Sequence, residues 1–279
     1  MRKDQSSETA LGVCFIRAVH QVIDEVPHIL EDPISPLLLD QESIRKVETH
    51  PEVQKSLHAR ALRSHVVLRS RYAEDRLYLA FKEGVRQYIS LGAGYDTFCL
   101  RQPEWAHSLR IVEADHPATQ SAKRKLLKEK GIDSPENVEF VPLDLEKEGV
   151  REGLTRSKLD PSQPTLVSCM GVLAYLTSET VRSVFKSIAG MPRGSRLVVA
   201  FAPKKGGSDA GKMSASRRAA EHGEPWLTRF EVEELKKELL KSGFRVVSFL
   251  TPSEAKAQYY AGRQDLPPPN MVRLCEATA

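Results

Sequence analysis

A glycine-rich turn is the first feature of the sequence that could do chemistry. Residues 91–97 read Leu-Gly-Ala-Gly-Tyr-Asp-Thr, so that only Ala93 separates Gly92 from Gly94. Glycines at this spacing let the backbone turn tightly and approach a ligand more closely than a Cβ would allow. Taken alone the pattern is weak, because two glycines can also simply connect a strand to a helix.

The residues after the glycines indicate the kind of ligand. A dinucleotide fingerprint carries a third glycine three positions after Gly94, where this chain has Thr97. Asp96 places a carboxylate near the start of the next helix, where it would repel a bound pyrophosphate. A ligand without phosphate but with positive charge fits better, and S-adenosylmethionine, with its sulfonium and ammonium groups, is such a ligand.

Two further acids follow later predicted strands. Asp115 lies about 20 residues after Gly94, the spacing of an acid that accepts both hydroxyls of a ribose, although a helix cap is its structural alternative. Asp144 could accept from an adenine amino group while the next backbone N–H, that of Leu145, meets a ring nitrogen. Acids are common in loops, so neither residue alone is a specific signal. The prediction rests on acids that recur at the ends of successive strands.

The elements that position these acids alternate between strand and helix. Strands are predicted at 87–91, 109–114, 138–141, 165–170, 196–201, 244–250 and 271–275. Helices are predicted at 118–130, 178–191 and 228–242. This alternation predicts an α/β fold, a doubly wound, mostly parallel sheet whose ligand lies at the carboxyl ends of the strands. Residues 1–85 are predicted to form a helical N-terminal cover and residues 86–279 one compact ligand-binding domain.

Composition narrows the class of protein. The 279 residues carry 41 Lys and Arg against 37 Asp and Glu, a net charge of +4, which is too small to indicate a dedicated nucleic-acid binder. The four cysteines lie far apart, at Cys14, Cys99, Cys169 and Cys275. This spacing does not match the usual zinc-ligand motifs, and the absence of a disulfide pattern indicates a reducing compartment. No signal peptide and no run of 18 apolar residues is found, so we expect a cytoplasmic protein without membrane contact. The cysteine spacing leads us to expect no bound metal.

Several segments together make the sequence similar to a known family. They are residues 88–97, 113–120, 144–145, 171–176, 223–226 and 259–263, together with Lys123. In order and spacing they resemble the leucine carboxyl methyltransferase-like family of S-adenosylmethionine-dependent methyltransferases, over roughly residues 60–275. The resemblance implies a class I methyltransferase fold, Rossmann-like, with seven strands of which the last is antiparallel.

The resemblance also implies roles for individual residues. Gly92 would contact the methionine part of the cofactor, Asp115 the ribose, and Asp144 with Leu145 the adenine. The arginine that pairs with the cofactor carboxylate in the family best matches Arg71, and a guanidinium suits that task. The full predicted cofactor set is Arg71, Gly92, Ala93, Gly94, Asp96, Asp115, His116, Asp144, Leu145 and Met170.

Met170 departs from the family pattern. The family commonly has a glutamate there as a partner for the cofactor ammonium, and a thioether is a poor acceptor for a charged hydrogen bond. Backbone carbonyls and water would have to replace that carboxylate, or cofactor affinity is reduced. An inactive relative of the family is therefore one of the alternatives.

The acceptor side is less defined. Tyr175, Tyr259 and Arg263 are the candidate catalytic or substrate-binding residues, and a core tyrosine or a surface ion pair are their structural alternatives. Methyl transfer from a sulfonium depends mainly on positioning, and no residue identifies itself as a general base. This favours O-methylation of a carboxylate or hydroxyl on a small molecule or a peptide C-terminus.

Two alternative functions stay open. One is a nicotinamide (NAD)-linked oxidoreductase, which Asp96 and Thr97 disfavour. The other is a non-catalytic relative that binds a ligand or RNA, suggested by Met170 and by the basic residues between 54 and 73. Nucleic acid is not the expected partner, because that stretch has a single tyrosine, Tyr72, and no Phe or Trp to stack bases. A glycine-rich segment at 206–218 is expected to form a loop over the substrate.

Overall fold

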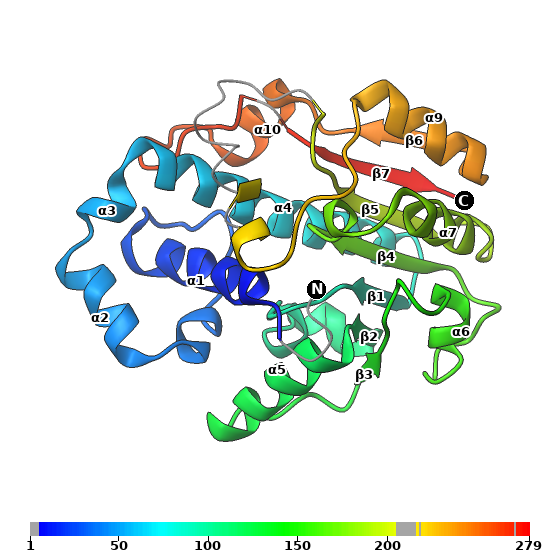
Figure 1. The fold of residues 1–279 in the computed structure, drawn as a ribbon, viewed down its shortest axis with the longest axis horizontal. Helices are drawn as coiled ribbons and strands as arrows, with labels where there is room; N and C mark the ends of the chain where they lie inside the picture. Colours follow the sequence, from blue (N-terminus) through cyan, green and yellow to red (C-terminus); the bar gives the residue numbers. More distant parts are fainter. Residues whose placement is uncertain (1–5, 205–215, 218, 271) are drawn as a thin grey trace.

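A seven-stranded sheet forms the centre of the computed structural model, which describes residues 6–204, 216–217, 219–270 and 272–279 (Figure 1). The strands are β1 (Gln87–Leu91), β2 (Arg110–Asp115), β3 (Val138–Pro142), β4 (Thr165–Met170), β5 (Arg196–Ala200), β6 (Val246–Phe249) and β7 (Leu274–Thr278). Their order is β3-β2-β1-β4-β5-β7-β6. Strands β1 to β5 pair in parallel, and β7 runs antiparallel to β5 and β6. The predicted mostly parallel seven-stranded sheet with an antiparallel last strand is confirmed.

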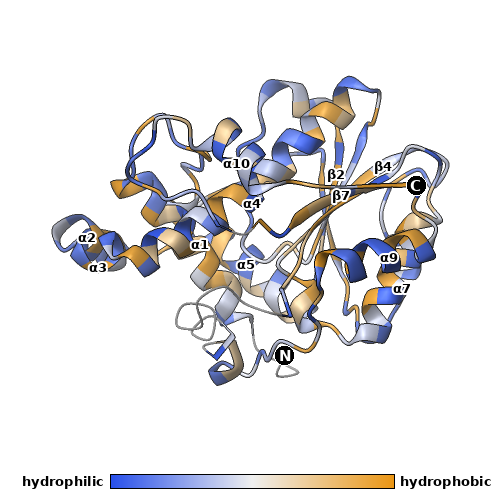
Figure 2. Cartoon of the chain, turned by 90° about the horizontal axis from the view of Figure 1, so that it is seen from above, coloured by the Kyte–Doolittle hydropathy of each residue, from blue (hydrophilic) through white to orange (hydrophobic). Residues whose placement is uncertain are grey.

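Apolar residues on both faces of the sheet explain why these segments become central strands. Every residue of β1 is buried, with Tyr88 in the core on one face and Ile89 and Leu91 in the core on the other. The strands are accordingly mostly hydrophobic in Figure 2. The sheet therefore needs helices on both faces, as in other doubly wound folds.

Helices cover the two faces of the sheet and extend beyond one end of it. They are α1 (Glu8–Ile23), α2 (Gln41–Thr49), α3 (Glu52–Lys55), α4 (Leu57–Lys82), α5 (Pro117–Glu129), α6 (Val150–Leu154), α7 (Ser178–Ala189), α9 (Val232–Ser242) and α10 (Pro252–Tyr259). Short 3-10 turns lie at Ser35–Leu38, Phe98–Leu100, Glu104–Ser108 and Leu173–Tyr175. Helices α4 and α10 contribute to the core on one face, and α6, α7 and α9 to the core on the other. Helices α1 to α4 form the predicted helical N-terminal region.

Some boundaries differ from the prediction for identifiable reasons. The helix expected from residue 228 begins at Val232, because the Thr228 hydroxyl donates to Leu176 O and the Phe230 N–H donates to Ala202 O. The last strand runs later than expected, at Leu274–Thr278, and residue 271 lies outside the described residues. Helices α2 and α10 were not predicted, although Thr251 and Glu254 form a capping box at the start of α10.

A buried ion-pair network joins the N-terminal helices to the glycine turn. Arg17 of α1 pairs with Asp32 at 2.8 Å and donates to Tyr95 O at 2.6 Å. Asp32 also accepts from the Thr97 hydroxyl at 2.7 Å and lies 3.4 Å from Arg101. Burial alone would raise the pKa of Asp32, but the two guanidinium groups hold that pKa below its ordinary value. The network fixes α1 beside the glycine turn.

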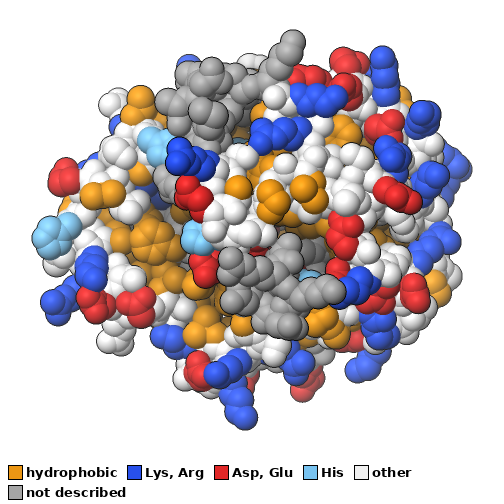
Figure 3. Space-filling view, viewed as in Figure 1, with side chains coloured by type: hydrophobic (Ala, Val, Ile, Leu, Met, Phe, Trp, Pro, Cys, Tyr) orange, Lys and Arg blue, Asp and Glu red, His pale blue; other side chains and the backbone are white. Residues whose placement is uncertain are grey.

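The described residues also bear on the cysteines, on membrane-spanning helices, on the predicted loop at 206–218 and on the surface charge. All four cysteines are buried and free. No helix within the described ranges is long and apolar enough to cross a membrane. The segment 206–218 lies outside the described residues apart from 216 and 217. Positive and negative side chains are interspersed over the face shown in Figure 3.

Candidate functional site

A cavity of about 270 Å³ lies at the carboxyl ends of β1, β2 and β4. The glycine turn and the strand ends form its floor, and the start of α1 together with Glu224, Pro225 and Leu227 forms its cover. In Figure 1 the start of α1 (blue) and the segment before α9 (yellow) lie side by side to the left of the strands, at their carboxyl ends. The cavity is therefore at the position where doubly wound sheets bind their ligands.

The glycine turn requires glycine at both positions. Gly92 has φ +70°, and a Cβ there would collide with the side chain of Val172. Gly94 has φ +53°, and a Cβ there would lie 2.9 Å from the Cβ of Ala10. A side chain at either position would both strain the backbone and close the space between α1, the turn and the loop after β4.

Asp115 presents its carboxylate to the cavity at the end of β2. It accepts hydrogen bonds from the N–H groups of Gly94 and His116, the latter at 2.6 Å. Burial raises the pKa of Asp115 to about 6, although the two N–H groups favour the ionised form. The carboxylate is thus mostly ionised at neutral pH and can accept from hydroxyl groups of a ligand.

The residues predicted to lie near the adenine all line the cavity. His116 caps α5 by accepting from Ala118 N at 3.3 Å, and its Nε2 lies 3.6 Å from Asp144 Oδ2. Asp144 pairs with Lys147 at 2.7 Å. Burial alone would raise the pKa of Asp144, but Lys147 and a backbone N–H hold it below its ordinary value. Every predicted cofactor residue except Arg71 lines the cavity: Gly92, Ala93, Gly94, Asp96, Asp115, His116, Asp144, Leu145 and Met170.

The structure places Arg69 of the preceding helix at the cavity and not Arg71, the predicted cofactor arginine. Arg71 is exposed and pairs with Asp75 at 2.9 Å, away from the cavity. Arg69 lines the cavity instead, beside Gly171. Two residues turn an α-helix by about 200°, so these side chains point to nearly opposite sides. Burial lowers the pKa of Arg69 from its ordinary value, and the guanidinium remains charged.

Only one of the three acceptor-side candidates reaches the cavity. Tyr175 lines it, and burial raises the pKa of its phenol above the ordinary value. Tyr259 donates to Asp75 at 2.8 Å, and burial followed by the Asp75 charge raises its pKa. Arg263 pairs with Asp265 at 2.6 Å and donates to the Glu25 carbonyl. These two residues fasten the C-terminal segment to the N-terminal helices and do not line the cavity.

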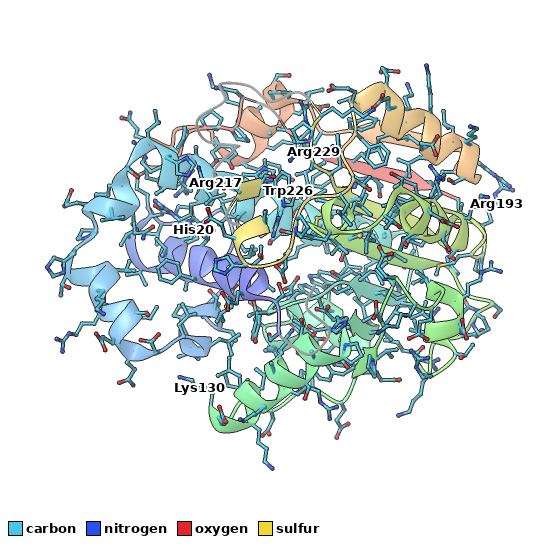
Figure 4. The ribbon with its side chains drawn as sticks, viewed as in Figure 1. His20, Lys130, Arg193, Arg217, Trp226 and Arg229 are labelled. Carbon is cyan, nitrogen blue, oxygen red and sulfur yellow. The ribbon has the colours of Figure 1, made fainter. Side chains whose placement is uncertain are left out.

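The structure adds polar residues that had no predicted role. Glu224 is 6% exposed, lines the cavity and accepts from the Ser7 hydroxyl at 3.1 Å. Thr9 Oγ1 and Trp226 Nε1 are buried beside the Tyr175 hydroxyl. Within the described part of the chain neither atom forms a hydrogen bond of good geometry, although both contacts oppose the rise in the pKa of that phenol. Arg229 stacks on Trp226 at 5.2 Å, and both side chains are labelled in Figure 4. No group of side chains suited to hold a metal ion occurs in the described ranges.

The sheet order and the site together define a class of protein. A glycine turn after β1, an acid at the end of β2 and another after β3 surround one cavity on a β3-β2-β1-β4-β5-β7-β6 sheet. These are the features of a class I S-adenosylmethionine-dependent methyltransferase.

Comparison with known sequences identifies the family. The family model "Leucine carboxyl methyltransferase" matches residues 10–189, and the chain belongs to this family. It is 31% identical over 291 residues to "Putative S-adenosyl-L-methionine-dependent methyltransferase YktD" of Bacillus subtilis (strain 168), covering 95% of each chain. A "Putative S-adenosyl-L-methionine-dependent methyltransferase" of Mycobacterium avium (strain 104) is 29% identical over 211 residues, 70% of this chain and 65% of the relative. The chain is therefore an S-adenosylmethionine-dependent methyltransferase.

Solved structures agree on the fold. A DUF574 family protein from Streptomyces avermitilis MA-4680 aligns with a TM-score of 0.59 at 15% identity, over 99% of this chain and 97% of that one. A protein described as a "putative methyltransferase" from Thermobifida fusca YX aligns with the same TM-score at 16% identity, over 99% and 96%. The whole described chain, including the N-terminal helices, thus follows a known arrangement.

Proposed function

We propose that the chain transfers the methyl group of S-adenosylmethionine to an oxygen atom, on a carboxylate or hydroxyl of a small molecule or of a peptide C-terminus. The supporting observation is a cluster of hydrogen-bond donors at one wall of the cavity. It consists of the hydroxyl groups of Tyr175 and Thr9, which both line the cavity, and of the Trp226 indole N–H beside Tyr175. An acceptor oxygen has lone pairs to accept from such donors and still face the methyl group, whereas a nucleophilic amine has only one.

The remaining cavity residues suit the cofactor. Arg69 would bind its carboxylate, the glycine turn its methionine part, Asp115 its ribose, and Asp144 with Leu145 its adenine. The cofactor supplies an activated methyl group on its sulfonium. The protein would hold the acceptor oxygen in line with that methyl and exclude water, and such positioning can contribute about 7–11 kcal/mol. A carboxylate acceptor is already ionised and needs no general base.

The experiment that tests this proposal compares acceptors on one scaffold. Purified protein and S-adenosylmethionine are incubated with hexanoate, hexanol and hexylamine, and with benzoate, phenol and aniline, and the methylated product is identified by mass spectrometry. We expect methyl esters or ethers and no methylated amine. Methylation of the amines alone would contradict O-methylation.

A further inference from the structure

Glu224 differs from the other carboxylates around the cavity in how its charge is compensated. Asp115 accepts two backbone N–H groups, and Asp96 accepts the Phe98 N–H at 2.8 Å. Asp144 has Lys147, and Glu146 accepts the Thr177 N–H at 2.8 Å. Within the described part of the chain, the Glu224 carboxylate has a single hydrogen bond, from the neutral hydroxyl of Ser7.

The position of Glu224 is fixed from two sides. Its backbone N–H donates to Ala219 O at 2.7 Å, and Leu227 N donates to Ala174 O at 2.6 Å, which ties this segment to the turn before Tyr175. On the other side Ser7 holds the carboxylate and itself donates through its N–H to Thr119 Oγ1 at 3.1 Å. The carboxylate is therefore held over the cavity between α1, α5 and the turn after β4.

A buried carboxylate with so little compensation is unfavourable unless a cation approaches it. Arg69 lines the same cavity with a positive charge, and within the described ranges it forms no ion pair. The other cavity arginine, Arg17, is already paired with Asp32. One unpaired cation and one weakly compensated anion around a single cavity are complementary to a zwitterion.

We propose that Glu224 binds the ammonium group of the cofactor while Arg69 binds its carboxylate, so that the two residues together hold the amino acid end of S-adenosylmethionine. Glu224 thereby supplies from the cover of the cavity the carboxylate that Met170 does not supply from the end of β4. This inference rests on the cofactor placement described under the proposed function.

The test uses three ligands that differ in charge. S-adenosylmethionine has an ammonium and a sulfonium, S-adenosylhomocysteine only the ammonium, and 5′-methylthioadenosine neither. Each is titrated by calorimetry into the wild-type protein, Glu224→Gln and the control Glu221→Gln, which removes the same charge from an exposed residue paired with Arg217 nearby. We expect Glu224→Gln to weaken the binding of S-adenosylmethionine and S-adenosylhomocysteine at least tenfold and the binding of 5′-methylthioadenosine less than twofold. Glu221→Gln should leave all three affinities unchanged.

Each other outcome contradicts a different statement. If Glu224→Gln leaves S-adenosylhomocysteine binding unchanged, Glu224 does not bind the ammonium, even if S-adenosylmethionine is weakened. If the binding of 5′-methylthioadenosine is weakened as much as that of the other two ligands, Glu224 acts only through the structure of the site. If the wild-type protein binds none of the three ligands, the cofactor placement itself is wrong.

Discussion

The guanidinium of Arg69 lies so close to Gly171 that a Cβ at residue 171 would stand 2.5 Å from Arg69 Nη1. Gly171 follows β4 and has φ +79°, a conformation that few other residues adopt. The glycine therefore gives the arginine space to cross the end of β4 and line the cavity. Helix α4 and the end of β4 form this wall together.

Replacing Arg69 tests which arginine of α4 serves the site. Arg69→Gln should weaken S-adenosylhomocysteine binding at least tenfold, because the ligand carboxylate loses its charged partner. Arg71→Gln should change the affinity less than twofold, since Arg71 is exposed and paired with Asp75. Calorimetry on both variants checks this prediction, and the reverse order of effects would restore Arg71 to the site.

The pKa of Asp115 predicts how cofactor binding depends on pH. A raised pKa of about 6 means that the carboxylate becomes protonated as the pH falls below 6 and loses acceptors for the ribose hydroxyls. The apparent affinity for S-adenosylhomocysteine should follow the ionised fraction, decreasing about tenfold from pH 6.5 to pH 5. Asp115→Asn should bind more weakly with a flatter profile. Equal slopes for both proteins would assign the pH dependence to another group.

Tyr175 is expected to affect turnover more than cofactor binding. Tyr175→Phe removes the hydroxyl of the donor cluster and keeps the ring that lines the cavity. We expect kcat to decrease about a hundredfold, the lower end of the range for loss of one preorganised donor, with S-adenosylhomocysteine affinity within about twofold. Steady-state kinetics with the best oxygen acceptor measures this effect, and an unchanged kcat would remove Tyr175 from the acceptor site.

The Asp32 network is expected to stabilise the fold. Asp32→Ala leaves Arg17 buried without its partner, which should lower the free energy of unfolding by about 3–5 kcal/mol. In the control Glu42→Ala, an exposed pair with Lys46 is lost, and the effect should stay below about 0.5 kcal/mol. Because the folded-state pKa of Asp32 lies below its ordinary 3.8, its contribution is present above that pH and is lost as the pH falls. Urea unfolding at neutral and acidic pH tests both statements.

Local patterns were sufficient to predict the strands and most of the cofactor side of the cavity. The strand ends carry Asp115 and Asp144, and a parallel sheet brings such ends together whatever the loops do. Arg69 could also have been found, because apolar residues flank it at helical spacing on both sides, Val66 before it and Ala73 after it. Arg71 is followed at that spacing by the charged residues Glu74 and Asp75.

Other parts of the site depend on contacts between distant segments. Glu224 reaches the cavity only because its loop is bonded to Ala174 and Ser7, and no local pattern fixes those contacts. Tyr259 and Arg263 resembled acceptor-side residues in the sequence, yet partners far along the chain, Asp75 and Glu25, hold them elsewhere. A side chain's charge shows what it can bind, and the tertiary fold decides which partner it meets.

We propose that this cavity binds S-adenosylmethionine through Asp115, the acid at the end of β2. Calorimetric titration of S-adenosylhomocysteine into the wild-type protein and Asp115→Ala tests it most directly. We predict one binding site per chain in the wild-type protein and an affinity at least tenfold weaker in the variant. No binding by the wild-type protein would contradict the claim that the cavity binds the cofactor, and a change of less than twofold in the variant would remove Asp115 from the site.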